Sequence, residues 1–273
     1  MPGSRYSFLD LTVLAELRRR VLSPEATILF GDDMHAVLWA NAPGAALFGG
    51  TDLAELIDLP LGQTQPFVRQ LRDAATQIED GEPLVRGFRV ARGLRTEFIQ
   101  CELSRIHLPA GEEAVLLVCT EDRLTKPARE HELAARAVDS LVGLASAAAI
   151  VDDYGLAIAA TGNFADIDLA PEDIAILVGE AAEEADRLVK RVAELGDGGV
   201  VAVGVARLRD RPGRYLLVCA EAGGETEETD DDATAIDTAE AMTFVPASEP
   251  LDEPVAAPEH GDALPEAAVA DEH

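Results

Sequence analysis

Aromatic residues are scarce in this sequence of 273 residues, at 4% of the total, although 48% of the residues are hydrophobic. Any hydrophobic core must therefore be built mainly from Ala, Val, Leu and Ile. There is enough apolar material for such cores, and the length favours one large domain or two small ones.

Basic residues are also few, with 22 Lys and Arg against 51 Asp and Glu, for a formal net charge of −29. Binding to nucleic acid or to an anionic membrane needs clustered cations, so we expect neither partner and no membrane insertion. Residues 222–273 contain sixteen Asp or Glu and no Lys or Arg. Because that segment also lacks hydrophobic periodicity, the sequence predicts a disordered acidic tail over 223–273.

Cysteines and long apolar runs are the remaining shortages. Cys101, Cys119 and Cys219 form no close-spaced pair and sit in apolar, strand-like runs, so we expect buried thiols, a reducing compartment and no metal site. The most apolar uncharged stretch, 140–151, is too short to span a bilayer, which needs about 20 residues. No signal peptide is evident, and the sequence predicts a cytoplasmic protein.

The first half of the sequence predicts a helix, a hairpin, more helices and three strands. Residues 1–25 contain an amphipathic helix whose apolar positions are Phe8, Leu11, Leu14, Leu17 and Val21. Asn41 is placed to cap a short helix after the hairpin. The expected strands are 27–30, 36–40, 84–90, 98–106 and 114–120, and the longer helix is 65–78.

An internal repeat organises the second half. The motif Leu-Leu-Val-Cys ends the first unit at 116–119 and returns at 216–219, and an Asp-Asp pair follows the first strand of each unit. Helical spacing predicts a connecting helix over 124–148 and one long helix from Pro171 to Leu195. The second unit is then about 20 residues shorter than the first, with middle helices and one strand missing.

The hairpin, the segment Leu38-Trp39-Ala40-Asn41 leading into a small helix, and the three closing strands resemble a PAS domain. We therefore expect an α+β fold of two tandem PAS-like domains, each an antiparallel sheet with helices on one face. The expected divisions are an N-terminal helix at 1–25, a PAS domain at 26–122, a helical linker at 123–147, a degenerate PAS-like domain at 148–222, and the tail.

The tandem arrangement resembles the N-terminal sensory region of an alphaproteobacterial cytoplasmic sensor histidine kinase. That resemblance implies a homodimer whose sensory domains act on a kinase core and contact response regulators. The sequence contains no Asn box and no glycine-rich ATP-binding boxes, so we expect no catalytic region and no enzyme activity in this chain. Apolar seams place a candidate dimer interface at Leu11, Leu14, Leu17, Leu133, Leu141, Leu144, Leu177 and Leu188. For the connecting helix, packing on its own domain explains the same spacing equally well. A ligand would lie between the helix 65–78 and the sheet, near Trp39, Asn41, Phe67, Leu71, Phe88 and Phe98.

No cofactor is expected, because the helix 65–78 lacks a histidine for haem and Ala42 and Pro43 stand where a flavin photosensor needs a cysteine. Two other functions compete with a sensory one. A phosphoacceptor receiver would use Asp32, Asp33, Asp58 and Lys126, and a non-sensing scaffold would need none of them. His131-Glu132-Leu133 is similar to the start of a phosphoacceptor histidine motif but departs from it afterwards.

Overall fold

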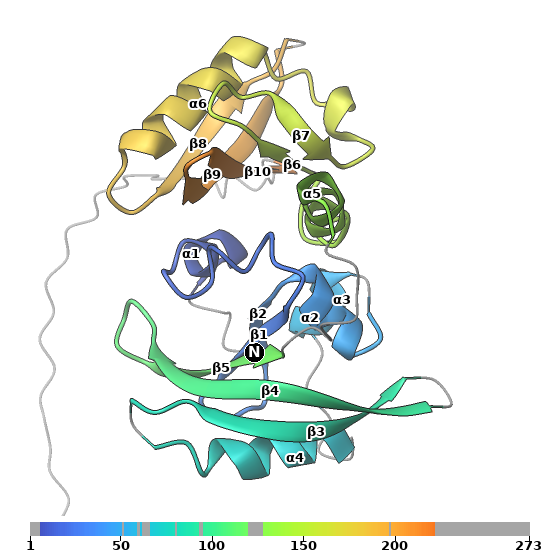
Figure 1. Ribbon diagram of the computed structural model, residues 1–273. Helices are drawn as coiled ribbons and strands as arrows, with labels where there is room; N and C mark the ends of the chain where they lie inside the picture. The colour runs from blue at the N-terminus through green and yellow to red at the C-terminus, as the bar shows by residue number, and fades with distance from the viewer. Residues whose placement is uncertain are drawn as a thin grey trace, which may run out of the picture. The chain divides into compact units, whose positions relative to one another are not determined.

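The protein folds around two five-stranded antiparallel sheets, both within the unit formed by residues 1–226 (Figure 1). This computed structural model describes residues 6–50, 52–58, 61, 66–79, 81–92, 95–119, 128–196 and 198–221. The expected tail at 223–273 lies outside the described residues. The α+β fold class predicted from the sequence is confirmed.

The first sheet has the strand order β2-β1-β5-β4-β3, and its central strand positions are buried on both faces. Every neighbouring pair is antiparallel. The hairpin forms as predicted, the first two closing strands are longer than predicted, and the third is shifted by one residue. The strands are β1 (Ala26–Gly31), β2 (Val37–Ala40), β3 (Leu84–Arg92), β4 (Arg95–His107) and β5 (Glu113–Cys119).

Three helices lie between β2 and β3 in the chain, and they contact β1, β2 and β3 in turn. They are α2 (Ala42–Leu47), α3 (Leu53–Asp58) and α4 (Pro66–Ala75). The inner face of this sheet, which α4 covers, is the face to which Ile28, Leu117 and Leu103 belong. Helix α4 runs along β3 (Figure 1). Its apolar side chains Phe67, Val68 and Leu71 are buried, as the helical spacing predicts.

The N-terminal helix is shorter than predicted. Helix α1 covers only Phe8–Thr12, and a series of turns carries the chain from there to Ser23. The turns use hydrogen bonds such as Leu17 N–H to Leu14 C=O, and the Arg20 carbonyl accepts from the Asn41 side chain at 2.8 Å. The expectation of one helix through Val21 is therefore wrong, because tertiary partners take carbonyls that a longer helix would use.

The connecting helix is also shorter than predicted. Helix α5 (Glu130–Asp139) ends before Leu141 and Leu144, and β6 (Ala147–Val151) begins soon after. The carbonyl of Ser140 accepts a hydrogen bond from the Leu53 N–H at 3.0 Å, which fixes the turn after the helix. The predicted start at 124 lies outside the described residues.

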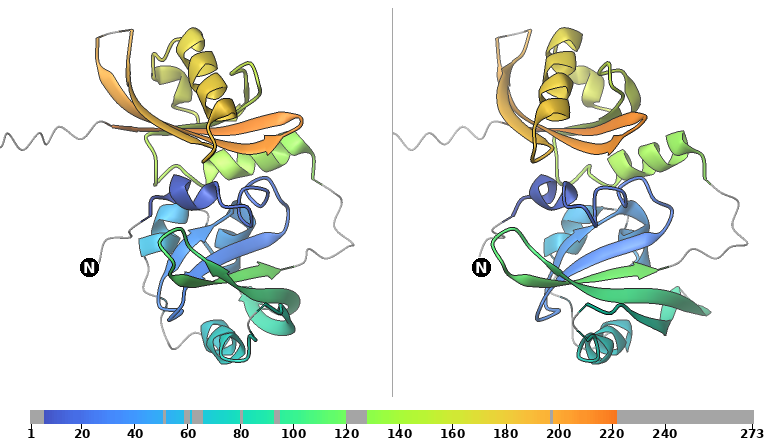
Figure 2. Two further views of the ribbon diagram at one scale, coloured as in Figure 1. Left: turned by 90° about the vertical axis from the view of Figure 1, so that its left-hand side faces the viewer. Right: turned by 60° about the vertical axis from the view of Figure 1, so that its left-hand side comes forward.

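The second sheet repeats the first, with the order β7-β6-β10-β9-β8. Its helices are reduced to a 3-10 turn (Phe164–Asp166) and α6 (Pro171–Glu183), which packs on β8 and β9 (Figure 2). The middle helices are fewer, as predicted, but the prediction of a missing strand is wrong. The strands besides β6 are β7 (Ala157–Ala160), β8 (Leu188–Glu194), β9 (Val200–Asp210) and β10 (Gly213–Glu221).

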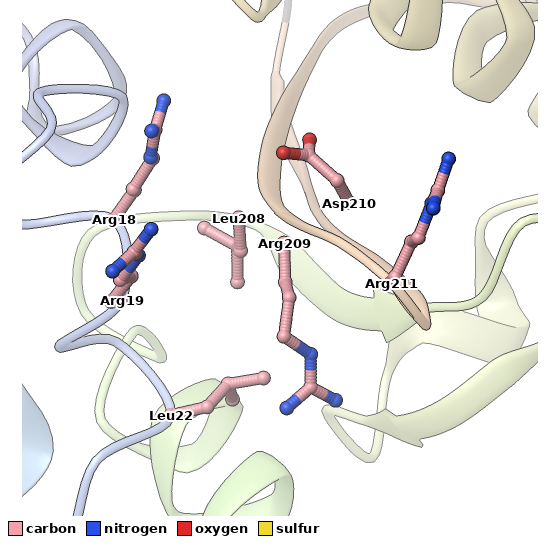
Figure 3. Close-up of a pocket in the computed structure, with 7 residues that line it drawn as sticks. All are labelled: Arg18, Arg19, Leu22, Leu208, Arg209, Asp210 and Arg211. Atoms are coloured by element: carbon pink, nitrogen blue, oxygen red, sulfur yellow. The ribbon is translucent and has the colours of Figure 1, made fainter.

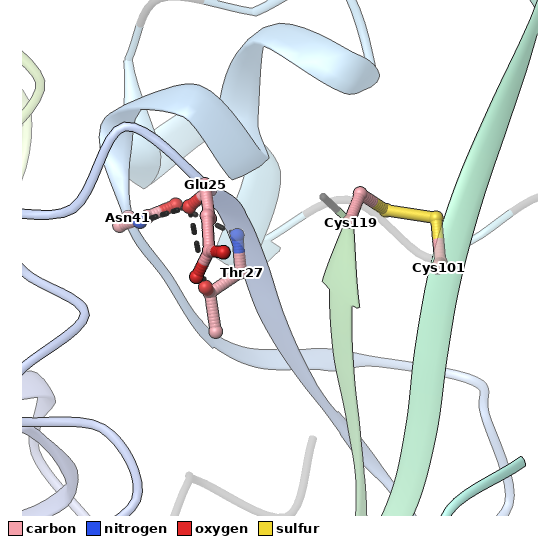
Figure 4. The surroundings of a disulfide bond; sticks show 5 residues. All are labelled: Glu25, Thr27, Asn41, Cys101 and Cys119. Atoms are coloured by element: carbon pink, nitrogen blue, oxygen red, sulfur yellow. Dashed lines mark hydrogen bonds between the residues drawn. A yellow bond between two sulfur atoms is a disulfide. The ribbon is translucent and has the colours of Figure 1, made fainter. Parts of the chain in front are cut away.

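The cysteines differ from the expectation of three buried thiols. Cys101 on β4 and Cys119 on β5 are direct partners in the strand register and form a disulfide, with their Cα atoms 3.9 Å apart (Figure 4). Cys219 is free and buried. Eighteen residues separate the paired cysteines, so only the pairing of β4 with β5 brings them together.

Candidate functional site

A row of aromatic side chains lies between α4 and the first sheet. Ring centroids lie 6.4 Å apart for Phe30 and Phe48, 5.6 Å for Phe48 and Phe67, and 6.0 Å for Phe67 and Phe88. Leu71 is fully buried beside them. These contacts form an aromatic cluster at the place where the sequence predicts that any ligand would lie, and edge-to-face pairs of this kind stabilise the fold.

Trp39 lies in a different environment, on the outer face of the sheet beneath α1. Its ring stacks on Phe8 with centroids 5.8 Å apart, and its indole N–H donates to the Thr12 hydroxyl at 2.9 Å. The side chain is fully buried, and the space beside it measures about 10 Å³. That is roughly the volume of one water molecule, so Trp39 packs α1 onto the sheet.

Asn41 joins three segments of the first domain by hydrogen bonds (Figure 4). Its side-chain oxygen accepts from the backbone N–H groups of Gly44 and Thr27, both at 2.9 Å. Its side-chain nitrogen donates to the carbonyls of Arg20 and Glu25, both at 2.8 Å. The predicted helix cap is confirmed, and the residue also ties the N-terminal segment to β1.

Thr161 occupies the corresponding position in the second domain. Its hydroxyl accepts from the Ala148 N–H at 3.1 Å, and its own N–H donates to the Ala148 carbonyl at 2.9 Å. Asn41 and Thr27 make the same reciprocal pair. The equivalence inferred from the repeat therefore holds at the level of hydrogen bonds, although Thr161 lacks the amide donor.

Phe98 does not line the space beneath α4. It is 73% exposed and lies over Gly87 on the outer face, where a Cβ on that glycine would be 1.9 Å from the ring. The alternation of β4 explains this position, because Cys101 and Leu103 are buried and Phe98 has the opposite parity. The prediction that Phe98 is a cavity residue is wrong.

The leucines predicted to form a dimer seam lie in or against the interior of the single chain. Leu11 and Leu17 are fully buried, Leu141 is 3% exposed and Leu177 is 7% exposed. Leu14, Leu144 and Leu188 pack against the same core as partly buried residues, and Leu133 on α5 is half-buried. The coiled-coil seam is therefore not formed, because the helices that would carry it are short and because Leu188 lies on a strand.

The acidic pairs after β1 and β6 have structural partners. Asp32 accepts from Arg105 at 2.7 Å and Asp33 accepts from the His35 N–H at 2.9 Å, while Asp152 closes the equivalent turn through Tyr154 and Leu156. No group of three or more metal-ligating side chains occurs among the described residues. A receiver needs its acidic pair beside a magnesium ion, and neither turn provides that arrangement. Asp58 ends α3, and Lys126 lies outside the described residues.

His131 lies exposed in the first turn of α5, and its ring Nδ1 is 2.9 Å from the Ile158 carbonyl of β7. The contact holds one ring nitrogen against the second domain. It gives His131 a role in packing α5 onto β7, in agreement with the contacts between these two elements.

Comparison with known proteins relates the chain to a histidine kinase. No protein-family model matches it. The cell-division control histidine kinase PdhS of Brucella suis is 31% identical over 243 residues, and the same is true of PdhS from Brucella canis. The alignment covers 89% of this chain but 22% of the relative, so the chain spans about a fifth of the length of the proteins it matches.

Solved structures with some likeness include the PAS domain of an HTR-like protein from Haloarcula marismortui, at a TM-score of 0.32 and 16% identity. A sensor histidine kinase domain from Geobacter sulfurreducens has a TM-score of 0.30 and 17% identity. They cover 40% and 44% of this chain, and 96% and 100% of their own chains.

Within the part of the chain that the structure describes, no helix has the length and apolar character needed to cross a membrane. The resemblance predicted from the residues is confirmed by the alignment with PdhS: the chain is similar, over most of its length, to part of an alphaproteobacterial cell-division histidine kinase.

Proposed function

We propose that this chain is a regulatory sensory module that acts on the kinase core of a two-component histidine kinase. The observation that carries the proposal is the 31% identity to PdhS across 243 residues, which includes both PAS-like domains. The chain spans only 22% of that relative. We therefore propose, by analogy with the relative, that the module acts together with a catalytic kinase core and a response regulator in cell division.

Contacts between the two domains support a relay. Asp10 of α1 forms an ion pair with Lys190 of β8 at 2.8 Å, and Leu9 lies against Gly204 of β9. On the other side, α5 packs on β7 while the turn after it bonds to Leu53 of α3. A change in either domain therefore reaches the other through packed elements, which is the physical requirement for coupling.

A chimera tests this function directly. The segment of Brucella suis PdhS that aligns with this chain is replaced by this chain, and autophosphorylation is measured with radiolabelled ATP. We expect activity within about threefold of intact PdhS and at least tenfold above a version in which an unrelated domain of equal length fills the segment. Equal activity of the two chimeras would contradict the proposal.

The chain by itself should incorporate no phosphate from ATP, because we place the kinase core outside it. It should also take none from acetyl phosphate with Mg²⁺, because neither Asp-Asp turn has the arrangement of a receiver site. Labelling of His131 or of an aspartate in the isolated chain would favour the phosphoacceptor alternative. If the chain were a scaffold that senses nothing, the activity of the chimera would not change with any stimulus.

Dimerisation, the absence of a cofactor and the cytoplasmic location are further parts of this proposal. The sequence supports a domain without haem or flavin, because α4 contains no histidine and because Ala42 and Pro43 follow Asn41 where a flavin photosensor needs a cysteine. Sedimentation should give twice the 28.9 kDa mass of one chain, and purified protein should show no visible absorption. Cell fractionation tests the cytoplasmic location. A sedimenting mass of one chain at all protein concentrations would contradict dimerisation.

A further inference from the structure

A pocket of about 430 Å³ lies between the segment after α1 and the tip of the β9–β10 hairpin (Figure 3). Small-molecule sites in proteins typically measure about 300–1,000 Å³. Arginines dominate its lining although the chain as a whole carries a net charge of −29. The lining residues are Arg18, Arg19, Leu22, Leu208, Arg209, Asp210 and Arg211.

The one carboxylate in the lining is already engaged. Asp210 accepts two hydrogen bonds from Arg187, at 2.8 and 2.9 Å, and Arg207 lies 3.5 Å from the same carboxylate. The hydrogen bond from Arg187 is the main cause that lowers the pKa of Asp210; burial opposes it, and Coulomb attraction to Arg187, Arg207 and Arg18 lowers the pKa further. Asp210 therefore stays ionised, and its hydrogen bonds go to Arg187 and not to the arginines that line the pocket.

Arg209 bonds to Glu130, but the other lining arginines form no ion pair with a carboxylate in the part of the chain that the structure describes. Arg19 and Arg211 make no ion pair or side-chain hydrogen bond among the described residues. Arg18 is half-buried, and its pKa is lowered by burial and by the neighbouring cations Arg187, Arg19 and Arg207, against a smaller opposing attraction to Asp210. A bound anion would relieve this repulsion, and guanidinium groups bind phosphate oxygens in paired geometry.

Two leucines supply the apolar part of the lining. Leu208 is buried at 2% exposure and Leu22 is half-buried. Figure 3 shows the N-terminal segment with Arg18, Arg19 and Leu22 facing Leu208 and Arg209 of the hairpin. Guanidinium groups in excess over carboxylates, beside an apolar patch, suit a ligand that carries phosphate on an uncharged body.

We propose that this pocket binds a small organic phosphate of nucleotide size, whose phosphate groups contact Arg18, Arg19 and Arg211 and whose body rests on Leu22 and Leu208. Several unpaired guanidinium groups favour a ligand with more than one negative charge over a monocarboxylate. The site would join the N-terminal segment to the second domain. Any effect of this ligand on a kinase core rests on the proposed sensory function. Binding of the ligand to the pocket does not depend on that function.

Calorimetric titration of the full chain at low salt tests the site, with ADP, pyrophosphate, adenosine and citrate as probes. We expect ADP to bind at one site, pyrophosphate to compete with it, and adenosine not to bind. The variant Arg19→Gln/Arg211→Gln should bind ADP at least tenfold more weakly. The affinity should also fall as salt is raised.

The matched control is Arg69→Gln/Arg89→Gln, which removes the same two charges from exposed positions on α4 and β3 of the first domain. It should bind ADP as the unmodified chain does. Absence of ADP binding, equal binding of citrate, or equal weakening in both variants would overturn the inference. None of these results affects the chimera comparison, because that assay measures the effect of the whole segment on the kinase core.

Discussion

Asn41 makes its four hydrogen bonds from a position that is only 3% exposed. Replacing it with alanine removes a helix cap and leaves buried backbone groups of Thr27 and Arg20 without partners. We expect Asn41→Ala to lower the free energy of unfolding by about 2–4 kcal/mol. Urea denaturation followed by circular dichroism measures the loss.

Thr161→Ala is the matched change in the second domain, where the side chain satisfies one backbone N–H. Its cost should be about 1 kcal/mol. A cost for Asn41→Ala no larger than that of Thr161→Ala would show that the extra bonds of the amide contribute nothing.

Burial raises the pKa of the Cys219 thiol to about 11. At pH 8 its thiolate fraction is then about 0.1%, roughly a hundredth of that of an unperturbed thiol with a pKa near 9. Native protein should therefore react very slowly with iodoacetamide, and the rate should rise with pH up to about 11. Rapid labelling of native protein at pH 8 would contradict the burial of Cys219.

The disulfide between Cys101 and Cys119 determines how many thiols can be titrated. Unfolded under non-reducing conditions, the protein should release one titratable thiol, and after reduction three. Disulfides are rare in the cytoplasm, so rapid alkylation during lysis measures whether Cys101 and Cys119 are paired in the cell. Three free thiols in purified, oxidised protein would contradict the pairing.

Phe67 and Phe98 show how position along an element decides the role of the same side chain. Phe67 is 7% exposed between Phe48 and Phe88, and Phe98 is 73% exposed on the opposite face of the sheet. Phe67→Ala should cost about 3–5 kcal/mol of unfolding free energy. Phe98→Ala should change it by less than about 0.5 kcal/mol.

Thermal and urea unfolding of the two variants side by side provides the measurement. Similar losses for both would mean that Phe98 is covered in solution, as by a second copy of the chain. A loss that depends on protein concentration would identify that case.

The element order of the first domain could be predicted from the sequence, because its turns and helix ends carry local signals such as Asn41 and Gly49-Gly50. The segment 184–195 could not. Leu188 and Val192 have helical spacing, yet they lie on β8, which pairs with β9. Arg187 has φ 62° and its guanidinium is held by Asp210, 23 residues away. No glycine or proline signals the break, so the information that ends α6 is not local.

The site residues were predicted less well for the same reason. Helical spacing and strand alternation place Phe67, Leu71 and Phe88 correctly in the interior. For β4, alternation shows that the side chains point to two faces, but it does not tell which of the two faces α4. The arginine pocket combines residues 18–22 with residues 208–211. Those segments approach only in the folded chain, and charge composition alone argues against an anion site in so acidic a protein.

Glu130 connects α5 to the last hairpin of the second domain. It accepts from Arg214 at 3.0 and 3.1 Å and also bonds to Arg209. The hydrogen bond from Arg214 is the main cause that lowers the pKa of Glu130 below its usual 4.5, against a smaller desolvation effect. A lowered carboxyl pKa means that the stabilisation is present above the unfolded pKa and is lost as pH falls through the folded one.

Glu130→Gln should therefore destabilise the protein at pH 7 and have progressively less effect below about pH 4.5. The side chain is 41% exposed, so solvent screening limits the loss to under about 1 kcal/mol. Chemical denaturation at pH 7 and at pH 3.5 measures the difference. An equal loss at both pH values would assign the effect to packing of the side chain.

Gly204 determines how closely α1 approaches the second domain. A Cβ at this position would lie 2.3 Å from the Leu9 Cδ1 atom, so any larger residue must displace the Leu9 side chain. Leu9 is 8% exposed and belongs to α1, whose Phe8 and Thr12 contact Trp39. Because Trp39 is the only tryptophan in the chain, its fluorescence reports on α1 although the substitution is in the other domain.

We expect Gly204→Val to shift the Trp39 emission toward longer wavelength and to lower the free energy of unfolding by about 1–3 kcal/mol. Gly179→Ala on α6 is the control, because a Cβ there meets no atom within 4 Å. It should leave the emission unchanged. If Gly204→Val destabilised the second domain while the Trp39 emission stayed at its original wavelength, α1 would not couple the two domains, and the relay would have to pass through α5.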